Sequence, residues 1–223
     1  MFGGFQSASE QFALQRERMV QTQLQARGIQ DPRVLAAMAR VPRHEFVPAE
    51  HHAQAYADHP IPIDQGQTIS QPFIVAVMLE HLRIQPHHCI LEIGTGSGYV
   101  TALLAELSEK VYSIERHAPL ANSARELLAR LHYHNVEVLA GDGYAGWPEH
   151  APFDGIAVSA AAMRIPAALF AQVREGGRMV IPVGPHDAQL LELVEKQDGR
   201  QVVSPLDACR FVPMLSGIDE NVH

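Results

Sequence analysis

Three glycines follow a short apolar run in the segment LEIGTGSGY, residues 91–99. Gly94, Gly96 and Gly98 are spaced two residues apart, and glycine lets a backbone turn tightly and lets a ligand approach it closely. The pattern predicts a strand, a turn and a helix whose first N–H groups are free for a ligand. The spacing differs from the dinucleotide motif G-x-G-x-x-G, and Glu92 precedes it. A carboxylate there disfavours a phosphate and favours an amine or another cation; a plain tight turn is the alternative.

Two acids follow at the ends of the next two apolar runs. Glu115 ends KVYSIE, about 20 residues after the first glycine, where an acid accepts hydrogen bonds from both ribose hydroxyls. Asp142 lies in LAGDG, where it can accept a hydrogen bond from an adenine amino group. A solvent-facing strand end and an ordinary turn are the simpler explanations of the two acids. Three sites at successive strand ends predict a ligand with an adenosine, a cationic or amine-bearing part and no required phosphate.

The residues around these candidates alternate between two patterns. Short apolar runs predict strands at residues 88–94, 110–115, 136–142, 153–161 and 178–184. Longer stretches predict helices at residues 9–27, 31–41, 73–84, 99–107, 118–131 and 166–173. This alternation predicts right-handed βαβ units on a mostly parallel, doubly wound sheet, an α/β fold of Rossmann-like type. Such a fold brings the three strand ends to one edge of the sheet.

The two ends of the chain differ from this core. Residues 174–177, REGG, predict a turn, and two further strands joined by a DGR turn predict an antiparallel C-terminal edge. The first helices predict an N-terminal helical extension. We find no internal repeat and no linker, so we expect a single domain over residues 1–223. Its expected parts are an N-terminal helical and substrate-loop region, a cofactor-binding βαβ core and C-terminal antiparallel strands, at residues 1–83, 84–185 and 186–223.

The composition excludes several classes of protein. Of 223 residues, 47% are apolar and 19% are charged, which is typical of a globular protein. A net charge of −8 with only 17 lysines and arginines disfavours a nucleic-acid surface, which needs clustered positive charge. No apolar run reaches the roughly 20 residues that cross a bilayer, and the N-terminus lacks an apolar signal core. We therefore expect a cytoplasmic protein, with Cys89 and Cys209 as buried free thiols.

A neutral segment with two hydroxyls lies before the glycines. PIPIDQGQTISQPF, residues 60–73, contains Thr68 and Ser70 but no base and no charge pair. We interpret it as the holder of a substrate that is already a nucleophile and needs no activating base. A hydrolase nucleophile would require a G-x-S-x-G elbow, which TISQP does not provide. The 13 histidines match no zinc spacing, so we expect no metal.

Several motifs occur in one order over about residues 19–217: MVQTQLQARGI, VLAAMARVPRHEFVP, GQTISQP, LEIGTGSGY, GDG, APFDGI, EGGRMVIPVG and RFVPM. The glycine loop and acids resemble the S-adenosylmethionine-dependent methyltransferases of Rossmann-like fold. The whole set, and GQTISQP above all, resembles the protein-L-isoaspartate O-methyltransferase family. The resemblance implies a repair enzyme that methylates the free α-carboxylate of L-isoaspartyl residues in proteins and peptides, with S-adenosyl-L-methionine as cofactor and S-adenosyl-L-homocysteine as product. We expect a monomer with no nucleic-acid or membrane partner.

The resemblance also implies roles for individual residues. Ser70 would be the catalytic residue, holding one oxygen of the substrate carboxylate and also contacting the cofactor. The other implied cofactor-binding residues are Gln67, Thr68, Ile69, Gly94, Thr95, Gly96, Glu115, Arg116, Gly141 and Asp142. Substrate contacts would come from Ser159 and Ala160, and from the backbone of Val212.

Two positions depart from the family pattern. Asp64 stands where we expect glycine, and SAAA replaces TAAP after the fourth strand. Two alternative functions stay open at this point. The chain could be a methyltransferase for another carboxylate or protein group, or a non-catalytic binding protein, although the presence of Ser70, Glu115 and Asp142 disfavours the latter.

Overall fold

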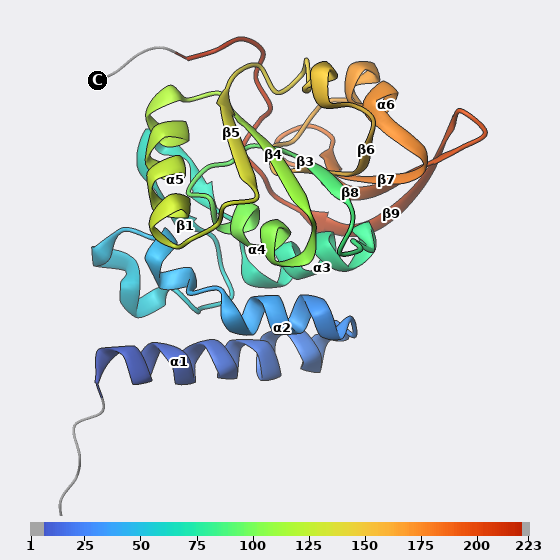
Figure 1. Cartoon of the computed structure of the whole chain (residues 1–223). Helices are drawn as coiled ribbons and strands as arrows, with labels where there is room; N and C mark the ends of the chain where they lie inside the picture. Colours follow the sequence, from blue (N-terminus) through green and yellow to red (C-terminus); the bar gives the residue numbers. More distant parts are fainter. Residues whose placement is uncertain (1–6, 220–223) are drawn as a thin grey trace, which may run out of the picture.

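A seven-stranded sheet forms the centre of the molecule in the computed structural model, which describes residues 7–219 (Figure 1). Its strands, in spatial order, are β5 (Val136–Ala140), β4 (Lys110–Glu115), β3 (Cys89–Ile93), β6 (Phe153–Val158), β7 (Val173–Val183), β8 (Gln189–Gln197) and β9 (Arg200–Cys209). Strands β3 to β7 pair in parallel, whereas β8 is antiparallel to both of its neighbours. The predicted parallel sheet with an antiparallel C-terminal edge is confirmed.

Helices cover both faces of this sheet. They are α1 (Ala8–Met19), α2 (Pro32–Arg40), α3 (Pro72–Leu82), α4 (Tyr99–Leu107), α5 (Ala118–Arg130) and α6 (Ala167–Gln172). One apolar core lies between the sheet and α3, α4 and α5, with α1 and α2 outside these helices (Figure 1). A second core lies between the opposite face and α6. A small separate sheet pairs β1 (Ile61–Pro62) with β2 (Thr68–Ile69) in the neutral segment before α3.

The predicted first helix has three parts rather than one. After α1, the chain continues as a π-helical segment, Val20–Leu24, and then as a 3₁₀ turn, Gln25–Arg27. It ends at Gly28, whose φ of 99° lies in the left-handed region that glycine tolerates best. The helical extension is thus present with the predicted end, but its backbone hydrogen bonding changes along its length.

The predicted turn REGG is not a turn but an irregular part of β7. Phe153 pairs with Val173 and Gly155 pairs with Arg178, so two steps along β6 face five steps along β7. The additional residues form a bulge, in which Gly176 has a φ of 73°. The glycines alone predict a chain reversal because a bulge and a turn make the same demand on the backbone.

The strand order creates a crevice at the centre of the sheet. After β3 the chain moves outward through β4 and β5, and it then returns to the other side of β3 as β6. The connections after β3 and β6 therefore leave in opposite directions, and open α/β sheets bind ligands at such a point.

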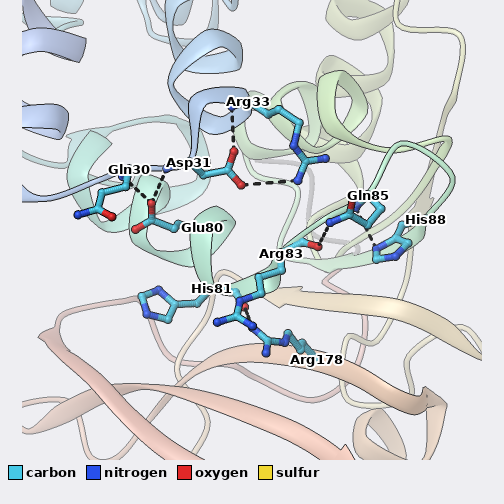
Figure 2. A network of polar contacts seen from close by, with 9 residues as sticks. All are labelled: Gln30, Asp31, Arg33, Glu80, His81, Arg83, Gln85, His88 and Arg178. Atoms are coloured by element: carbon cyan, nitrogen blue, oxygen red, sulfur yellow. Dashed lines mark hydrogen bonds and ion pairs between the residues drawn. The ribbon is translucent and has the colours of Figure 1, made fainter.

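Glu80 on α3 connects the N-terminal helices to the sheet layer (Figure 2). One of its carboxylate oxygens accepts the N–H groups of Gln30 and Asp31 at 2.6 and 2.7 Å, just before α2 begins. Asp31 itself caps α2, as predicted, by accepting the N–H of Arg33 at 2.8 Å. At the C-terminal end of α3, Arg178 of β7 donates to the carbonyl of His81 at 2.9 Å.

No helix among the described residues is long and apolar enough to cross a membrane.

Candidate active site

A single cavity at the carboxyl edge of the sheet joins segments that are far apart in the sequence. One part of its lining, which we call the strand-end wall, consists of residues 93–97, 114–117 and 159–160 at the ends of β3, β4 and β6. A second part, which we call the loop wall, consists of residues 66–70. The C-terminal segment, residues 212–215, supplies a third part. Of the predicted site residues, all line this cavity except Gly141 and Asp142.

The glycine loop turns as its sequence predicts. Gly94, Gly96 and Gly98 have φ values of 91°, 53° and 90°, which side chains with a Cβ rarely adopt. Gly98 lies immediately before α4, so the first N–H groups of that helix are directed toward the cavity edge. The loop therefore presents backbone rather than side chains to a ligand.

Glu115 holds this loop in place from the end of β4. One carboxylate oxygen accepts the N–H of Gly96 at 2.8 Å, and the other accepts the N–H of His117 at 2.9 Å. The residue is 5% exposed. Because a carboxylate offers about four acceptor positions, two bonds leave it able to accept two more. This capacity fits the ribose hydroxyls that the sequence predicts.

Glu92 does not face the cavity, which corrects the expectation that it meets a cationic ligand there. Its side chain lies on the face of β3 that α4 covers, where one oxygen accepts hydrogen bonds from Thr101 at 2.5 Å and Ser113 at 2.6 Å. Burial raises the pKa of Glu92 to about 8, so the carboxyl group holds its proton at neutral pH. Ser113 in turn contacts the hydroxyl of Thr95 at 2.6 Å. Glu92 therefore supports the strand-end wall from beneath.

Asp142 lies beside the cavity without lining it. Its two carboxylate oxygens accept the N–H groups of Tyr144 and Gly217, both at 2.9 Å. Gly141 is buried and donates to the carbonyl of Glu115 at 2.9 Å. Gly143 lines the cavity instead, and a Cβ at this position would come within 2.5 Å of Ile93. The adenine contact of Asp142 stays a prediction.

The loop wall carries Ser70 at the end of the small β1–β2 sheet. Ile61 pairs with Ile69, and the carbonyl of Ser70 accepts a hydrogen bond from Arg43 at 2.8 Å. Within residues 7–219 the hydroxyl of Ser70 makes no hydrogen bond, so it is available to a ligand. Asp64, the departure from the family pattern, is exposed and does not line the cavity.

Ser159 and Val212, for which the sequence predicts substrate contacts, both line the cavity. Ser159 follows β6 directly and donates its N–H to the carbonyl of Ile93 at 2.8 Å. Its hydroxyl is buried and has no partner among the described residues. The carbonyl of Val212 accepts the N–H of Ala161 at 2.8 Å, which ties the C-terminal segment to the end of β6. A buried hydroxyl without a partner is costly unless a ligand satisfies it.

Sequence reasoning missed several residues that line the cavity, among them Tyr99, His117, Gly143 and Met214. His117 follows Glu115 and Arg116 at a strand end, and Met214 follows Val212 closely, so their positions could have identified both. Tyr99 carried no such signal, because the first residue of an apolar helix reads as core.

No group of three or more His, Cys, Asp or Glu residues within the described chain could hold a metal ion.

Cys89 and Cys209 are unpaired as expected, but both are half-buried rather than fully buried. Burial raises the pKa of each thiol to about 11, so neither thiol is activated as a nucleophile.

The glycine loop, the acid at the end of β4 and the crevice between β3 and β6 define an enzyme of the Rossmann-like methyltransferase class. The family model described as protein-L-isoaspartate (D-aspartate) O-methyltransferase matches residues 14–219. The chain belongs to this family.

Relatives of this name are similar over most of the chain. The protein-L-isoaspartate O-methyltransferase of Koribacter versatilis is 57% identical over 204 residues, which cover 92% of each chain. That of Methanoculleus marisnigri is 54% identical and covers 90% of this chain and 91% of its own. A Plasmodium falciparum structure described as such a methyltransferase, in complex with S-adenosyl-L-homocysteine, has a TM-score of 0.79 and 27% identity. It covers 90% of this chain and 98% of its own.

Proposed function

We propose that this chain transfers a methyl group from S-adenosyl-L-methionine to the free α-carboxylate of L-isoaspartyl residues in damaged proteins and peptides. One observation carries the proposal beyond family membership. The neutral loop with Ser70 lines the same cavity as the glycine loop and Glu115, although these parts are separated in the sequence. The methyl ester then cyclises to a succinimide with loss of methanol, and the succinimide reopens in part to a normal aspartyl residue.

The residues present fit the cofactor. Glu115 retains acceptor positions, and the loop around Gly94 and Gly96 exposes backbone to the cavity. We assign the ribose hydroxyls to Glu115, the methionine part to the glycine loop, and the cover of the site to residues 67–69. When bound, S-adenosyl-L-methionine supplies a methyl group activated by a sulfonium.

The protein residues have little proton chemistry to perform. A carboxylate substrate is ionised at pH 7 and needs no general base. Ser70 donates a hydrogen bond to one carboxylate oxygen and thereby directs the other oxygen toward the methyl group. The walls exclude water and fix the direction of approach, and such positioning can contribute on the order of 7–11 kcal/mol.

We further propose that the protein acts as a cytoplasmic monomer. Its net charge of −8 and its unpaired thiols support a reducing compartment and no nucleic-acid partner. The division at residues 83 and 185 remains our proposal for the parts of one domain. Light scattering on the purified chain would test the monomer.

A matched pair of peptides tests the function. One contains L-isoaspartyl and the other contains aspartyl at the same position, and both are incubated with S-adenosyl-L-methionine labelled in its methyl group. We expect label as a base-labile ester on the isoaspartyl peptide alone. Equal labelling of both peptides, or labelling of neither with cofactor still bound, would point to another acceptor.

A further inference from the structure

Arg43 is a completely buried arginine that none of the roles above uses. It begins the 3₁₀ turn Arg43–Phe46 and has no exposed surface. Its Nε donates to the carbonyl of Ala55 and its Nη2 donates to the carbonyl of Ser70, both at 2.8 Å. Its third nitrogen, Nη1, is buried without a partner among the described residues. Arg43 therefore touches the backbone of the proposed catalytic residue.

The charge of Arg43 is not balanced by an adjacent acid. None of the ion pairs between described residues includes Arg43. Asp58 acts on it only at a distance, since that carboxylate is paired with Arg27 at 2.5 Å. Burial lowers the pKa of Arg43, yet a guanidinium keeps its proton in proteins. A buried cation without a counter-ion is costly, and a purely structural donor to two carbonyls would not need the charge.

Two of the three residues that contact the guanidinium line the cavity. Ser70 lies on the loop wall, and the ring of Tyr99, which also lines the cavity, is 4.7 Å from the guanidinium carbon. The proposed substrate brings a carboxylate to Ser70.

We propose that Arg43 is a positioning residue for methyl transfer, which fixes the Ser70 backbone and supplies the positive charge that the substrate carboxylate compensates. The inference rests on the proposed function and deepens it. It explains how a loop wall without charged side chains selects an anion. The positive charge lies on Arg43, which contacts the backbone of the loop wall at Ser70.

The loop has a second attachment, so a change at Arg43 need not detach it. The Nε2 of Gln71, next to Ser70, donates to a carboxylate oxygen of Asp58 at 2.9 Å, and the N–H of Phe73 donates to the other at 3.4 Å. We therefore expect variants of Arg43 to alter the geometry and charge at Ser70 while the loop stays in place.

The test uses Arg43→Met and Arg43→Lys in the full chain. Arg43→Met removes the charge and both hydrogen bonds, and we expect the KM for the isoaspartyl peptide to rise and kcat to fall, each about tenfold or more. Arg43→Lys keeps the charge without the two-pronged geometry, so KM should return toward wild type while kcat stays low. Calorimetry should show S-adenosyl-L-homocysteine binding within about threefold of wild type for both variants, because neither hydrogen-bond partner of Arg43 belongs to the strand-end wall.

Arg178→Met is the matched control. Arg178 is partly buried, donates to the backbone carbonyl of His81 and pairs with Glu195 (Figure 2), but it does not line the cavity. Its loss should lower the melting temperature and leave KM and kcat unchanged. Kinetic constants of Arg43→Met that match those of Arg178→Met would overturn the inference.

Two further outcomes are separable. If Arg43→Met does not fold, an unchanged kcat in Arg43→Lys overturns the inference by itself, and a lowered kcat with near-normal KM supports it. Failure of the wild-type protein to methylate the isoaspartyl peptide would overturn the proposed function and this inference together.

Discussion

The strand-end wall and the loop wall of the cavity differ in what holds them. The strand-end wall follows directly from paired strands, and Glu115 fixes it with two hydrogen bonds to nearby backbone. The loop wall ends a sheet of only two short strands, and its Ser70 is held by Arg43, 27 residues earlier in the chain. The strand-end wall is thus fixed by the sheet itself, whereas the loop wall depends on a contact with the segment that follows α2.

This difference assigns a function to the N-terminal extension. Helices α1 and α2 lie outside the sheet layers in Figure 1 and contribute no lining residue. The segment that follows them nevertheless supplies Arg43, which donates to the Ser70 carbonyl, and Asp58, which accepts from the side chain of Gln71. We infer that the cofactor site can remain intact when the substrate site is disturbed.

The largest effect should follow from Glu115→Ala. The variant loses the ribose acceptor and the bonds to Gly96 and His117, so affinity for S-adenosyl-L-homocysteine should fall by about 1.5–3 kcal/mol for each charged hydrogen bond lost. Calorimetry measures this. Glu175→Ala is the matched control, because Glu175 also accepts two backbone N–H groups, at the β8–β9 turn. Unchanged affinity in Glu115→Ala would refute the ribose assignment.

Ser70→Ala should lower methyl transfer without changing cofactor binding. Loss of one hydrogen bond to a charged substrate predicts a fall in kcat/KM worth about 1.5–3 kcal/mol, with cofactor affinity unchanged. Steady-state kinetics and calorimetry give the two quantities, and Ser204→Ala on β9 serves as a control. A large loss of cofactor affinity with normal turnover would show that Ser70 binds the cofactor and does not position the substrate.

Glu92→Gln tests the support beneath the strand-end wall. The pKa of Glu92 is about 8 in the folded protein against 4.5 ordinarily, so between these values the folded state binds the additional proton. The contribution of Glu92 to stability is therefore complete below pH 4.5 and is lost as pH rises toward 8. From pH 6 to pH 7 the unfolding free energy of wild type should fall by about 1.4 kcal/mol relative to Glu92→Gln.

Urea denaturation of both proteins at the two pH values measures this difference, with Glu126→Gln on the exposed face of α5 as the control. A difference between wild type and Glu92→Gln that does not change with pH would mean that Glu92 is ionised in the fold.

The smallest effect should come from Asp142→Ala. Its carboxylate lies beside the cavity without lining it, unlike that of Glu115, so cofactor affinity should fall by less than about 1.4 kcal/mol, or tenfold. The same calorimetric titration applies. A loss as large as that of Glu115→Ala would show that Asp142 turns to the adenine, as its position in the sequence predicts.

The sequence by itself determined the parts of the molecule that depend on neighbours along the chain. Alternating apolar runs and helical stretches predict the parallel sheet, the three glycines predict the loop after β3, and Asp31 with Pro32 predicts the start of α2. Glu115 was found because the end of a parallel strand fixes where its side chain lies. The family motifs likewise identified Ser70 and most residues that line the cavity.

Only the tertiary structure decided which groups face one another across the fold. Glu92 is directed away from the cavity because successive residues of a strand point to opposite faces, and the sequence does not say which face α4 covers. Asp142 meets Gly217 because the C-terminal segment returns to the sheet edge. Arg43 reads as an ordinary surface arginine until folding encloses it between Ala55, Ser70 and Tyr99. Burial and pairing are properties of the assembled layers, so spacing along the chain cannot supply them.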